Sequence, residues 1–313
     1  MAHTHKKYEL LIERCRSLPP VAAAVAHPCD RSSLEGTLEA ARLGLITPTL
    51  VGPAARIAAV AAECHLDISP YPVIDARFSQ ESAEKAVALV RSGQAEILMK
   101  GSLHTDELLG AVVKRETGLR TARRLSHCFV MDVPGHHDVI VITDAVINIA
   151  PTLEEKVDIV QNAIDLVHAL GVPEARVAIL SAMETVNPKV PSTVEAAALC
   201  KMADRKQITG GILDGPLALD NAISLEAARI KQIDSPVAGR ANVLVVPDLE
   251  AGNMLAKSLS FLAGAASAGI VLGAKVPIVL TSRADSLQAR LASCAVAVLL
   301  AHARREQAGK ALV

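Results

Sequence analysis

Three side chains of different chemistry follow one apolar segment near the end of the chain. Residues 276–281 read as a buried strand, and Ser282, Arg283 and Asp285 come directly after it. A guanidinium offers a fixed fork of donors for phosphate oxygens, and a hydroxyl or the N–H groups of a following helix can serve an oxyanion. Asp285 could accept a proton. The alternative is structural: Asp285 or Ser286 caps the last helix, and Arg283 pairs with an acid.

Two further polar segments follow apolar runs, at residues 100–105 and 214–220. Ligands of open α/β sheets bind beyond the carboxyl ends of strands, so both segments are candidates for a site. Lys100 could supply a point charge and Gly101 a close backbone approach to a phosphate. The alternative for Lys100 is an ordinary solvated lysine.

Nucleotide and metal signatures are missing from the chain. The glycines near residue 210 do not form a GxGxxG pattern, and there is no GxxxxGK[ST] run, which argues against dinucleotide and P-loop sites. His136 and His137 are adjacent, so in an extended segment they point to opposite faces. We therefore predict no metal.

Composition favours a small-molecule partner. Lys and Arg total 32 and Asp and Glu 33, which gives no net charge to attract nucleic acid or a membrane surface. The six cysteines form no CxxC pair, as is typical of reduced thiols in the cytoplasm. No apolar run reaches the roughly 18 residues of a spanning helix, and the N-terminus lacks an apolar signal core. We expect a cytoplasmic protein.

Strand and helix patterns alternate along the chain, which predicts the α/β class with mostly parallel sheets and helices on both faces. Residues 128–133 and 139–143 could form a hairpin or a crossing between lobes. Thr152 and Glu155 form a capping box before a helix over 154–170. Expected strands are 21–26, 49–51, 72–74, 97–99, 177–180, 211–213, 242–246 and 276–281; other expected helices are 33–43, 53–64, 80–91, 106–114, 192–203, 217–230 and 285–304.

Several segments together closely resemble the phosphate acetyltransferase and phosphate butyryltransferase family. The most specific are Gly215-Pro216-Leu217-Ala218-Leu219-Asp220 and Ser235-Pro236-Val237-Ala238-Gly239. The Met99-Lys100-Gly101, Gly118-Leu119-Arg120 and Thr281-Ser282-Arg283 segments are more similar to the butyryl-type branch. The chain also resembles the transferase half of proteins fused to an enoyl-CoA hydratase. The resemblance covers about residues 95–290.

The resemblance implies a fold and a reaction. The fold is two α/β lobes like those of isocitrate and isopropylmalate dehydrogenases, with the active site in the cleft and a homodimer or larger homo-oligomer. We expect residues 1–143 and 262–313 in the first domain and 144–261 in the second. The reaction is reversible transfer of a short acyl group, acetyl or butyryl, between CoA and orthophosphate. CoA and acyl-CoA are substrates, and no cofactor is bound permanently.

The same resemblance carries roles onto Ser282 and Arg283, which would contact phosphate and the reacting carbonyl. The aspartate that acetyl-type members use as base falls on Ala289 here, so Asp285 substitutes or the base lies elsewhere. An acetyl-type arginine is also missing, and Arg120 is our substitute. A thiol with a pKa of about 8.5 needs a base or a positive field before it attacks the acyl phosphate directly.

Seven further residues are expected to bind phosphate or CoA. Most have a structural alternative: Asp214 and Asp220 could cap a helix that begins near Leu217, Asn187 could make a turn, and the glycine-punctuated 235–239 segment could be an ordinary loop. The residues are Thr105, Asn187, Asp214, Gly215, Asp220, Ser235 and Gly239.

Two other functions stay open at this point. A metal-dependent decarboxylating dehydrogenase on a similar scaffold would need clustered aspartates and an adenosine site. A catalytically silent CoA-binding or assembly subunit is supported by Ala289. The acyl length cannot be read from the sequence, because one methylene changes selectivity by only about 1–3 kcal/mol. The sequence also leaves open whether the chain works alone or with a hydratase.

Overall fold

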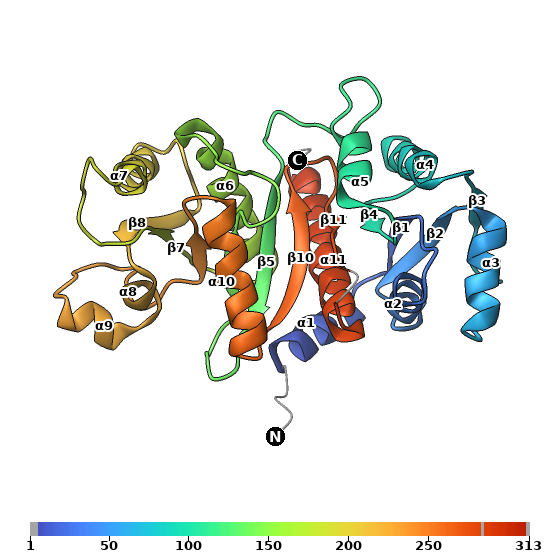
Figure 1. Ribbon diagram of the computed structural model, residues 1–313, viewed down its shortest axis with the longest axis horizontal. Coiled ribbons are helices and arrows are strands. Elements are labelled where there is room, and N and C mark those ends of the chain that lie inside the picture. The colour runs from blue at the N-terminus through green and yellow to red at the C-terminus, as the bar shows by residue number, and fades with distance from the viewer. Residues whose placement is uncertain (1–5, 283–284, 311–313) are drawn as a thin grey trace. The chain divides into compact units, whose positions relative to one another are not determined.

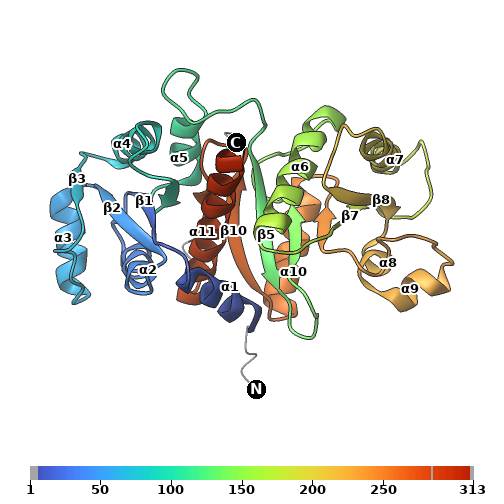
Figure 2. The same cartoon turned by 180° about the vertical axis from the view of Figure 1, so that it is seen from behind.

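The computed structural model describes residues 6–282 and 285–310 (Figures 1 and 2). Arg283, which we expected to hold phosphate, lies outside the described residues. The chain forms two compact units. We call Tyr8–Arg123 with Ala268–Val313 the terminal unit, and Arg124–Ser267 with Met1–Lys7 the central unit.

The sheet of the terminal unit is parallel except at one edge. Its strands run in the order β3, β2, β1, β4, β11, β10, and only β10 is antiparallel to its neighbour β11. Their bounds are β1 Val21–Ala26, β2 Ile46–Gly52, β3 Val73–Asp75, β4 Ile97–Lys100, β10 Ala266–Leu272 and β11 Ile278–Val279. The helices are α1 Lys6–Arg16, α2 Arg31–Arg42, α3 Ala54–Glu63, α4 Ser79–Arg91, α5 Thr105–Val112 and α11 Leu287–Lys310.

Strands β1 and β4 of this sheet are buried almost throughout because helices cover both faces. All four residues of β4 are buried, and so are five of the six residues of β1. Both views show α4 and α2 on opposite sides of β1 and β2 (Figures 1 and 2). Continuous burial of this kind is the pattern expected of parallel strands.

In the central unit, the strands run in the order β5, β6, β9, β7, β8. Strands β5 and β6 form an antiparallel pair, so the hairpin interpretation is confirmed, and the other neighbours are parallel. The strands are β5 Ser126–Asp132, β6 Ile140–Thr143, β7 Ala175–Leu180, β8 Gly211–Leu217 and β9 Val243–Val245. The helices are α6 Leu153–Ala169, α7 Pro191–Asp204, α8 Leu219–Ile223, α9 Leu225–Ile230 and α10 Leu249–Leu262.

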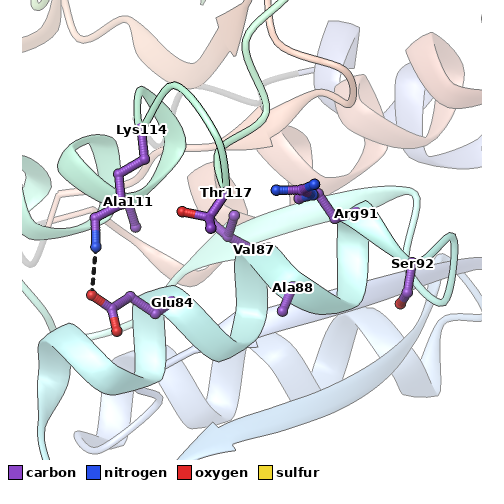
Figure 3. A pocket seen from close by; sticks show the side chains of 8 residues that line it. All are labelled: Glu84, Val87, Ala88, Arg91, Ser92, Ala111, Lys114 and Thr117. Carbon is purple, nitrogen blue, oxygen red and sulfur yellow. Dashed lines mark hydrogen bonds and ion pairs between the residues drawn. The ribbon is translucent and has the colours of Figure 1, made fainter.

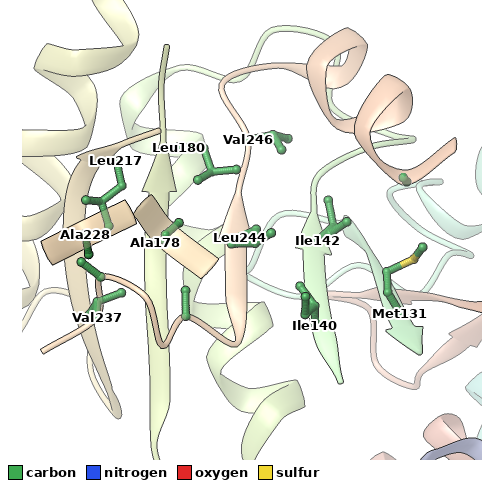
Figure 4. Close-up of a cluster of buried hydrophobic side chains, with 14 of the residues drawn as sticks. Met131, Ile140, Ile142, Ala178, Leu180, Leu217, Ala228, Val237, Leu244 and Val246 are labelled. Carbon is green, nitrogen blue, oxygen red and sulfur yellow. The ribbon is translucent and has the colours of Figure 1, made fainter. Parts of the chain in front are cut away.

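One apolar cluster joins the strands of the central unit. Ile142 of β6, Leu244 of β9 and Leu180 of β7 belong to it, together with Leu217 and Val237 (Figure 4). Each of these side chains is almost fully buried. The predicted capping box starts α6, since Thr152 N–H donates to Glu155 Oε2 at 2.8 Å and Glu155 N–H donates to Thr152 Oγ1 at 3.3 Å.

The α/β class and the mostly parallel sheets are confirmed, but some elements differ from expectation. The expected helix over 217–230 is wrong in its first part, because β8 continues to Leu217 and two short helices follow. Strand β10 and helix α1 were not predicted; β10 begins with four small residues, and only its last three are large aliphatic residues.

The chain passes from one unit to the other at different positions from those we expected. The boundaries fall between Arg123 and Arg124 and between Ser267 and Ala268, whereas we had placed them after residues 143 and 261. The reason is hydrogen bonding: β6 joins β9, and β5 joins β6, so both strands belong to the central sheet.

Within the described residues, no helix is long and apolar enough to cross a bilayer.

Candidate active site

Three parallel strands of the terminal unit, β1, β4 and β11, end side by side. The segments that we expected to bind phosphate begin at or just after the ends of β4 and β11. In the register of the sheet, Ala26 of β1 lies beside Lys100 of β4, and Met99 of β4 lies beside Val279 of β11. The carboxyl ends of parallel strands point the same way, so the segments after them share that edge. The sheet therefore brings Lys100 to the same edge as Ser282 and Asp285, which lie more than 180 residues later in the sequence.

Two hydrogen bonds join Ser282 and Asp285, a pair that we call the Ser282 turn. Ser282 N–H donates to Asp285 Oδ2 at 2.7 Å, and Asp285 N–H donates to the Ser282 carbonyl at 3.2 Å. Ser286, not Asp285, caps the helix that follows, because its hydroxyl accepts from Ala289 N–H at 3.2 Å. The turn leaves Ser282 exposed and Asp285 half-buried.

Burial raises the pKa of Asp285 above its usual value of 3.8, while the Ser282 N–H bond and the charges of Arg290 and Lys100 act in the opposite direction. Burial has the larger effect because a carboxylate is less well solvated there than in water. A raised pKa makes Asp285 a better proton acceptor. Asp285 is also the one carboxylate in the sequence between residues 276 and 305.

Position 289 cannot supply the base that the resemblance implies for it. Ala289 is 5% exposed, lies in the first turns of α11 and carries only a methyl group. Asp285 lies four residues earlier, in the turn before the helix.

Gly101 allows the segment after β4 to pack directly on the loop that follows β1. A Cβ at Gly101 would lie 2.5 Å from the carbonyl oxygens of both Ala26 and His27. Gly101 N–H donates to Ala26 O at 2.8 Å, and Ser102 donates to His27 O from both its N–H and its hydroxyl, each at 2.9 Å. The Gly101 N–H is therefore used in the scaffold.

Lys100 precedes this scaffold as the last residue of β4. Its side chain is buried at 5% exposure, with Nζ 3.4 Å from the Gly101 carbonyl. The alternative of a solvated lysine is therefore wrong. A buried ammonium is costly unless polar groups or anions surround it.

Thr105 and Arg120 are less closely tied to this edge. Thr105 is the first residue of α5 and is half-buried. Arg120 is exposed beside the buried Leu119, and its backbone forms an isolated antiparallel bridge with Ala274. Among the residues that the structure describes, Arg120 makes no hydrogen bond or ion pair with the Ser282 turn.

A residue missed by sequence reasoning, Arg290, lies directly behind the Ser282 turn. It is 3% exposed, and its guanidinium donates to Thr281 Oγ1 at 3.0 Å and to the Ser282 carbonyl at 2.7 Å. The signal was present in the sequence, because Arg290 is the one charged residue between Leu287 and Ala301. A lone arginine in an apolar helix needs polar partners at that position.

In the central unit, Asn187, Asp214 and Gly215 have local structural roles. Asn187 Oδ1 accepts from Lys189 N–H at 3.0 Å, the bond of the turn we gave as its alternative. Asp214 lies within β8, where its Oδ1 accepts from Gly215 N–H at 2.8 Å, so Asp214 does not cap a helix at Leu217. A Cβ at Gly215 would lie 2.8 Å from Ile179, so this glycine permits close strand packing.

The 235–239 segment packs on the short helices α8 and α9. Its Gly239 contacts Asn221, the residue after Asp220. Ser235 Oγ accepts from Val237 and Ala238 N–H at 3.0 and 3.1 Å, and Gly239 N–H donates to the Asn221 carbonyl at 2.7 Å. Gly239 has φ +74°, and a Cβ there would lie 2.6 Å from Leu225 Cα. Only glycine fits this position.

Asp220 faces a small charged group on the same surface. Lys231 Nζ lies 3.4 Å from Asp220 Oδ2 and 3.2 Å from Glu184 Oε2, and Asn221 Nδ2 is 3.4 Å from the same Glu184 oxygen. Asn221 is fully buried, and its Oδ1 has no hydrogen-bond partner among the described residues. The structure thus groups Asp220 with the loop that contains Gly239.

Asp144, the residue after β6, serves the fold of the central unit. Its carboxylate accepts from the N–H groups of His127, Val146 and Ile147 and from Asn148 Nδ2, at 2.6–3.1 Å. Burial lowers the pKa of His127 to about 4, with Asp144 acting in the opposite direction. His127 is therefore neutral at pH 7.

A surface hollow of 580 Å³ lies away from these residues, between α4 and the end of α5 (Figure 3). The Lys114–Glu84 ion pair, at 2.6 Å, crosses it (Figure 3). Most of its lining comes from α4, whose last turn leads to the amino end of the parallel strand β4, so we do not assign the chemistry to it. The lining residues are Glu84, Val87, Ala88, Arg91, Ser92, Ala111, Lys114 and Thr117.

Among the described residues, no group of three or more His, Cys, Asp or Glu side chains could hold a metal ion.

Comparisons with known proteins agree on one family. A family model described as "Phosphate acetyl/butaryl transferase" matches residues 76–298. The chain is 66% identical over 299 residues to a phosphate acetyltransferase of Rhizobium meliloti, which covers 96% of this chain and 95% of that protein. It is 40% identical over 296 residues to a phosphate butyryltransferase of Clostridium beijerinckii, covering 95% and 98%.

A solved structure has the same fold. The crystal structure of a branched-chain phosphotransacylase from Enterococcus faecalis V583 matches with a TM-score of 0.79 at 32% identity. The match covers 90% of this chain and 99% of that one.

Proposed function

We propose that this chain, which belongs to the phosphate acetyl/butaryl transferase family as its motifs predicted, transfers an acetyl group reversibly between CoA and orthophosphate. Acetyl-CoA and orthophosphate give acetyl phosphate and CoA. The observation that carries the proposal is the Ser282–Asp285 turn beside the buried Lys100 at one strand edge. Identity of 66% to an acetyltransferase, against 40% to a butyryltransferase, favours acetyl.

The chemistry needs a thiolate and a stabilised oxyanion. Asp285 takes the proton of the CoA thiol, and the sulfur attacks the carbonyl carbon of acetyl phosphate. The new C–S bond gives a tetrahedral oxyanion, which collapses as the C–O bond to phosphate breaks. The Ser282 hydroxyl donates to the carbonyl oxygen as negative charge develops on it. Lys100 and Arg283 hold the departing phosphate by charge, and no covalent enzyme intermediate is needed.

We assign the phosphate side to the terminal unit and CoA binding to the central unit. Thr105 and Arg120 would assist phosphate binding. In the central unit, Gly215 and Gly239 permit close backbone packing, and Asn187, Asp214, Asp220 and Ser235 shape the loops around them. Both glycines pack against protein, Gly215 on Ile179 and Gly239 on Leu225, so in CoA binding they would hold the loops in place.

The proposal includes a setting for the enzyme. We place it in the cytoplasm, as a homodimer or larger homo-oligomer, with acyl-CoA, acyl phosphate and orthophosphate as its small-molecule partners and without nucleic acid or membrane. All six cysteine thiols are unpaired, which suits a reducing compartment.

One assay tests the function. Acyl phosphates of two to five carbons are incubated with CoA, and the loss of free thiol is followed. We expect turnover that is fastest with acetyl phosphate. Fastest turnover with butyryl phosphate would contradict the choice of acetyl. CoA binding without thiol loss on any substrate would favour the silent-subunit alternative, for which Ala289 is the supporting observation.

A further inference from the structure

Arg290 is a buried guanidinium in an otherwise apolar helical segment. It is 3% exposed, and from Leu287 to Ala301 the helix α11 carries no other charged residue. Removing a charge from water costs several kcal/mol unless the protein replaces the lost interactions. A leucine or methionine would fill this place at lower cost, so the charge requires an explanation.

The guanidinium connects the Ser282 turn to the start of α2. Nη1 donates to Thr281 Oγ1 at 3.0 Å, while Nη2 donates to the Ser282 carbonyl at 2.7 Å and to Ser32 Oγ at 3.3 Å. Arg290 N–H also donates to the Ser286 carbonyl at 3.1 Å, which anchors the residue in the first turn of its helix. Arg290 thus restrains both residues that precede the proposed phosphate ligand Arg283.

The positive charge of Arg290 is not neutralised by an ion pair among the described residues. Its hydrogen bonds go to two hydroxyls and a carbonyl, and its Nε has no hydrogen-bond partner in that part of the chain. The positive charge of Arg290 favours the ionised form of both Asp30 and Asp285. Asp30 Oδ1 instead accepts from Ser33 N–H at 2.8 Å as the cap of α2, and Asp285 Oδ2 accepts from Ser282 N–H.

The surroundings favour an anion at this edge. Lys100 is a second buried cation, and it also acts on Asp285. Arg290 and Lys100 both act on Asp285, and Asp30, the other carboxylate that interacts with the charge of Arg290, caps α2, so a phosphate is the ligand that these two cations favour. The buried Nε cannot itself reach a ligand, so Arg290 acts through the turn and through its field.

We infer that Arg290 is a positioning residue for phosphate: its guanidinium fixes the Thr281–Ser282 backbone and supplies an unneutralised positive charge behind the Ser282 turn. The inference rests on the proposed function of this turn. It differs from the proposed role of Arg283, which would contact phosphate directly.

The test compares Arg290→Met and Arg290→Lys with the full-length wild type. Dissociation constants for inorganic phosphate and for CoA are measured by calorimetry, together with KM and kcat for acyl transfer. For Arg290→Met we expect phosphate affinity to fall at least about tenfold, as for loss of charge-assisted bonds, with CoA affinity within about twofold. Arg290→Lys should recover part of the phosphate affinity through its charge, but kcat should stay low because lysine lacks the fork.

Arg304→Met is the matched control. Arg304 lies on the same helix, and its Nη1 donates to the carbonyls of Ala274 and Lys275 at 3.2 and 3.0 Å, away from the Ser282 turn. Its loss should leave phosphate affinity unchanged. Equal loss of phosphate affinity in Arg304→Met and Arg290→Met would reduce Arg290 to a structural role.

Other outcomes separate this inference from the proposed function. Unchanged phosphate affinity in Arg290→Met overturns the inference even if the wild type turns over acetyl phosphate. Wild-type protein that binds phosphate through Arg290 without any acyl transfer refutes the proposed function and leaves the inference standing. If Arg290→Met does not fold, Arg290→Lys decides, because wild-type kcat and phosphate affinity in that variant would overturn the inference.

Discussion

At the scale of single residues, Asp285 is the side chain on which the proposed mechanism depends most. It lies in the Ser282 turn, and burial raises its pKa while Ser282 N–H, Arg290 and Lys100 oppose that rise. A carboxylate destabilised by burial is a stronger base than one in water. The same burial makes the ionised form unfavourable for the fold.

Asp285→Asn should therefore separate activity from stability. We expect kcat/KM for acetyl phosphate and CoA to fall about 10²- to 10⁴-fold, as for a lost general base. The acid limb of the pH profile, which lies above pH 3.8 because the pKa is raised, should disappear. Rates are measured across pH 4–9 by thiol loss.

Stability gives the second readout for this variant. Because the folded pKa of Asp285 is raised, its contribution to stability is present below the unfolded pKa and is lost as pH rises through the folded pKa. Removing the charge should leave the melting temperature at pH 7 unchanged or higher. A wild-type pH profile in Asp285→Asn would return Asp285 to the role of a turn residue.

At the scale of elements, the site depends on close packing of the loops after β1 and β4. Gly101 makes this possible, because any side chain there would meet the carbonyls of Ala26 and His27 at 2.5 Å. Neither contact can relax easily, since both oxygens belong to backbone. The loop after β4 therefore tolerates no Cβ at its first residue.

Gly101→Ala should destabilise the protein by about 1–3 kcal/mol or more through overpacking. It should also lower kcat/KM, because Lys100 moves with its neighbour.

Gly110→Ala is the control: Gly110 lies within α5, and a Cβ added there would have nothing within 4 Å among the described residues. Alanine there should stabilise by about 0.5–1 kcal/mol. Chemical denaturation measures both, and equal stability of the two variants would contradict the packing argument.

At the scale of the whole molecule, buried histidine makes stability depend on pH. His127 is fully buried in β5, and burial lowers its pKa from 6.5 to about 4. The unfolded chain takes up a proton at this residue as pH falls through 6.5, whereas the folded chain does so only near pH 4. Stability is therefore lost as pH falls through this window.

We expect this histidine to account for about 3 kcal/mol of the loss in unfolding free energy between pH 7 and pH 4. His127→Phe should flatten that part of the curve, since the ring already packs edge-on against Phe129 at 4.4 Å. The measurement is denaturant unfolding at several pH values. The exposed His65→Phe is the comparison, and an equal effect of both variants would contradict the role of burial.

The sequence by itself determined the α/β alternation, the capping box of α6 and the family, because each is written in local periodicity or in contiguous motifs. It could not determine that β8 runs on to Leu217 or that β5 and β6 join the central sheet, since pairing partners lie far apart in the chain. Tertiary structure alone placed Arg290 behind Ser282 and joined its guanidinium to Ser32 of α2. Burial, charge and hydrogen bonding depend on neighbours from distant segments, and only the folded chain assembles them.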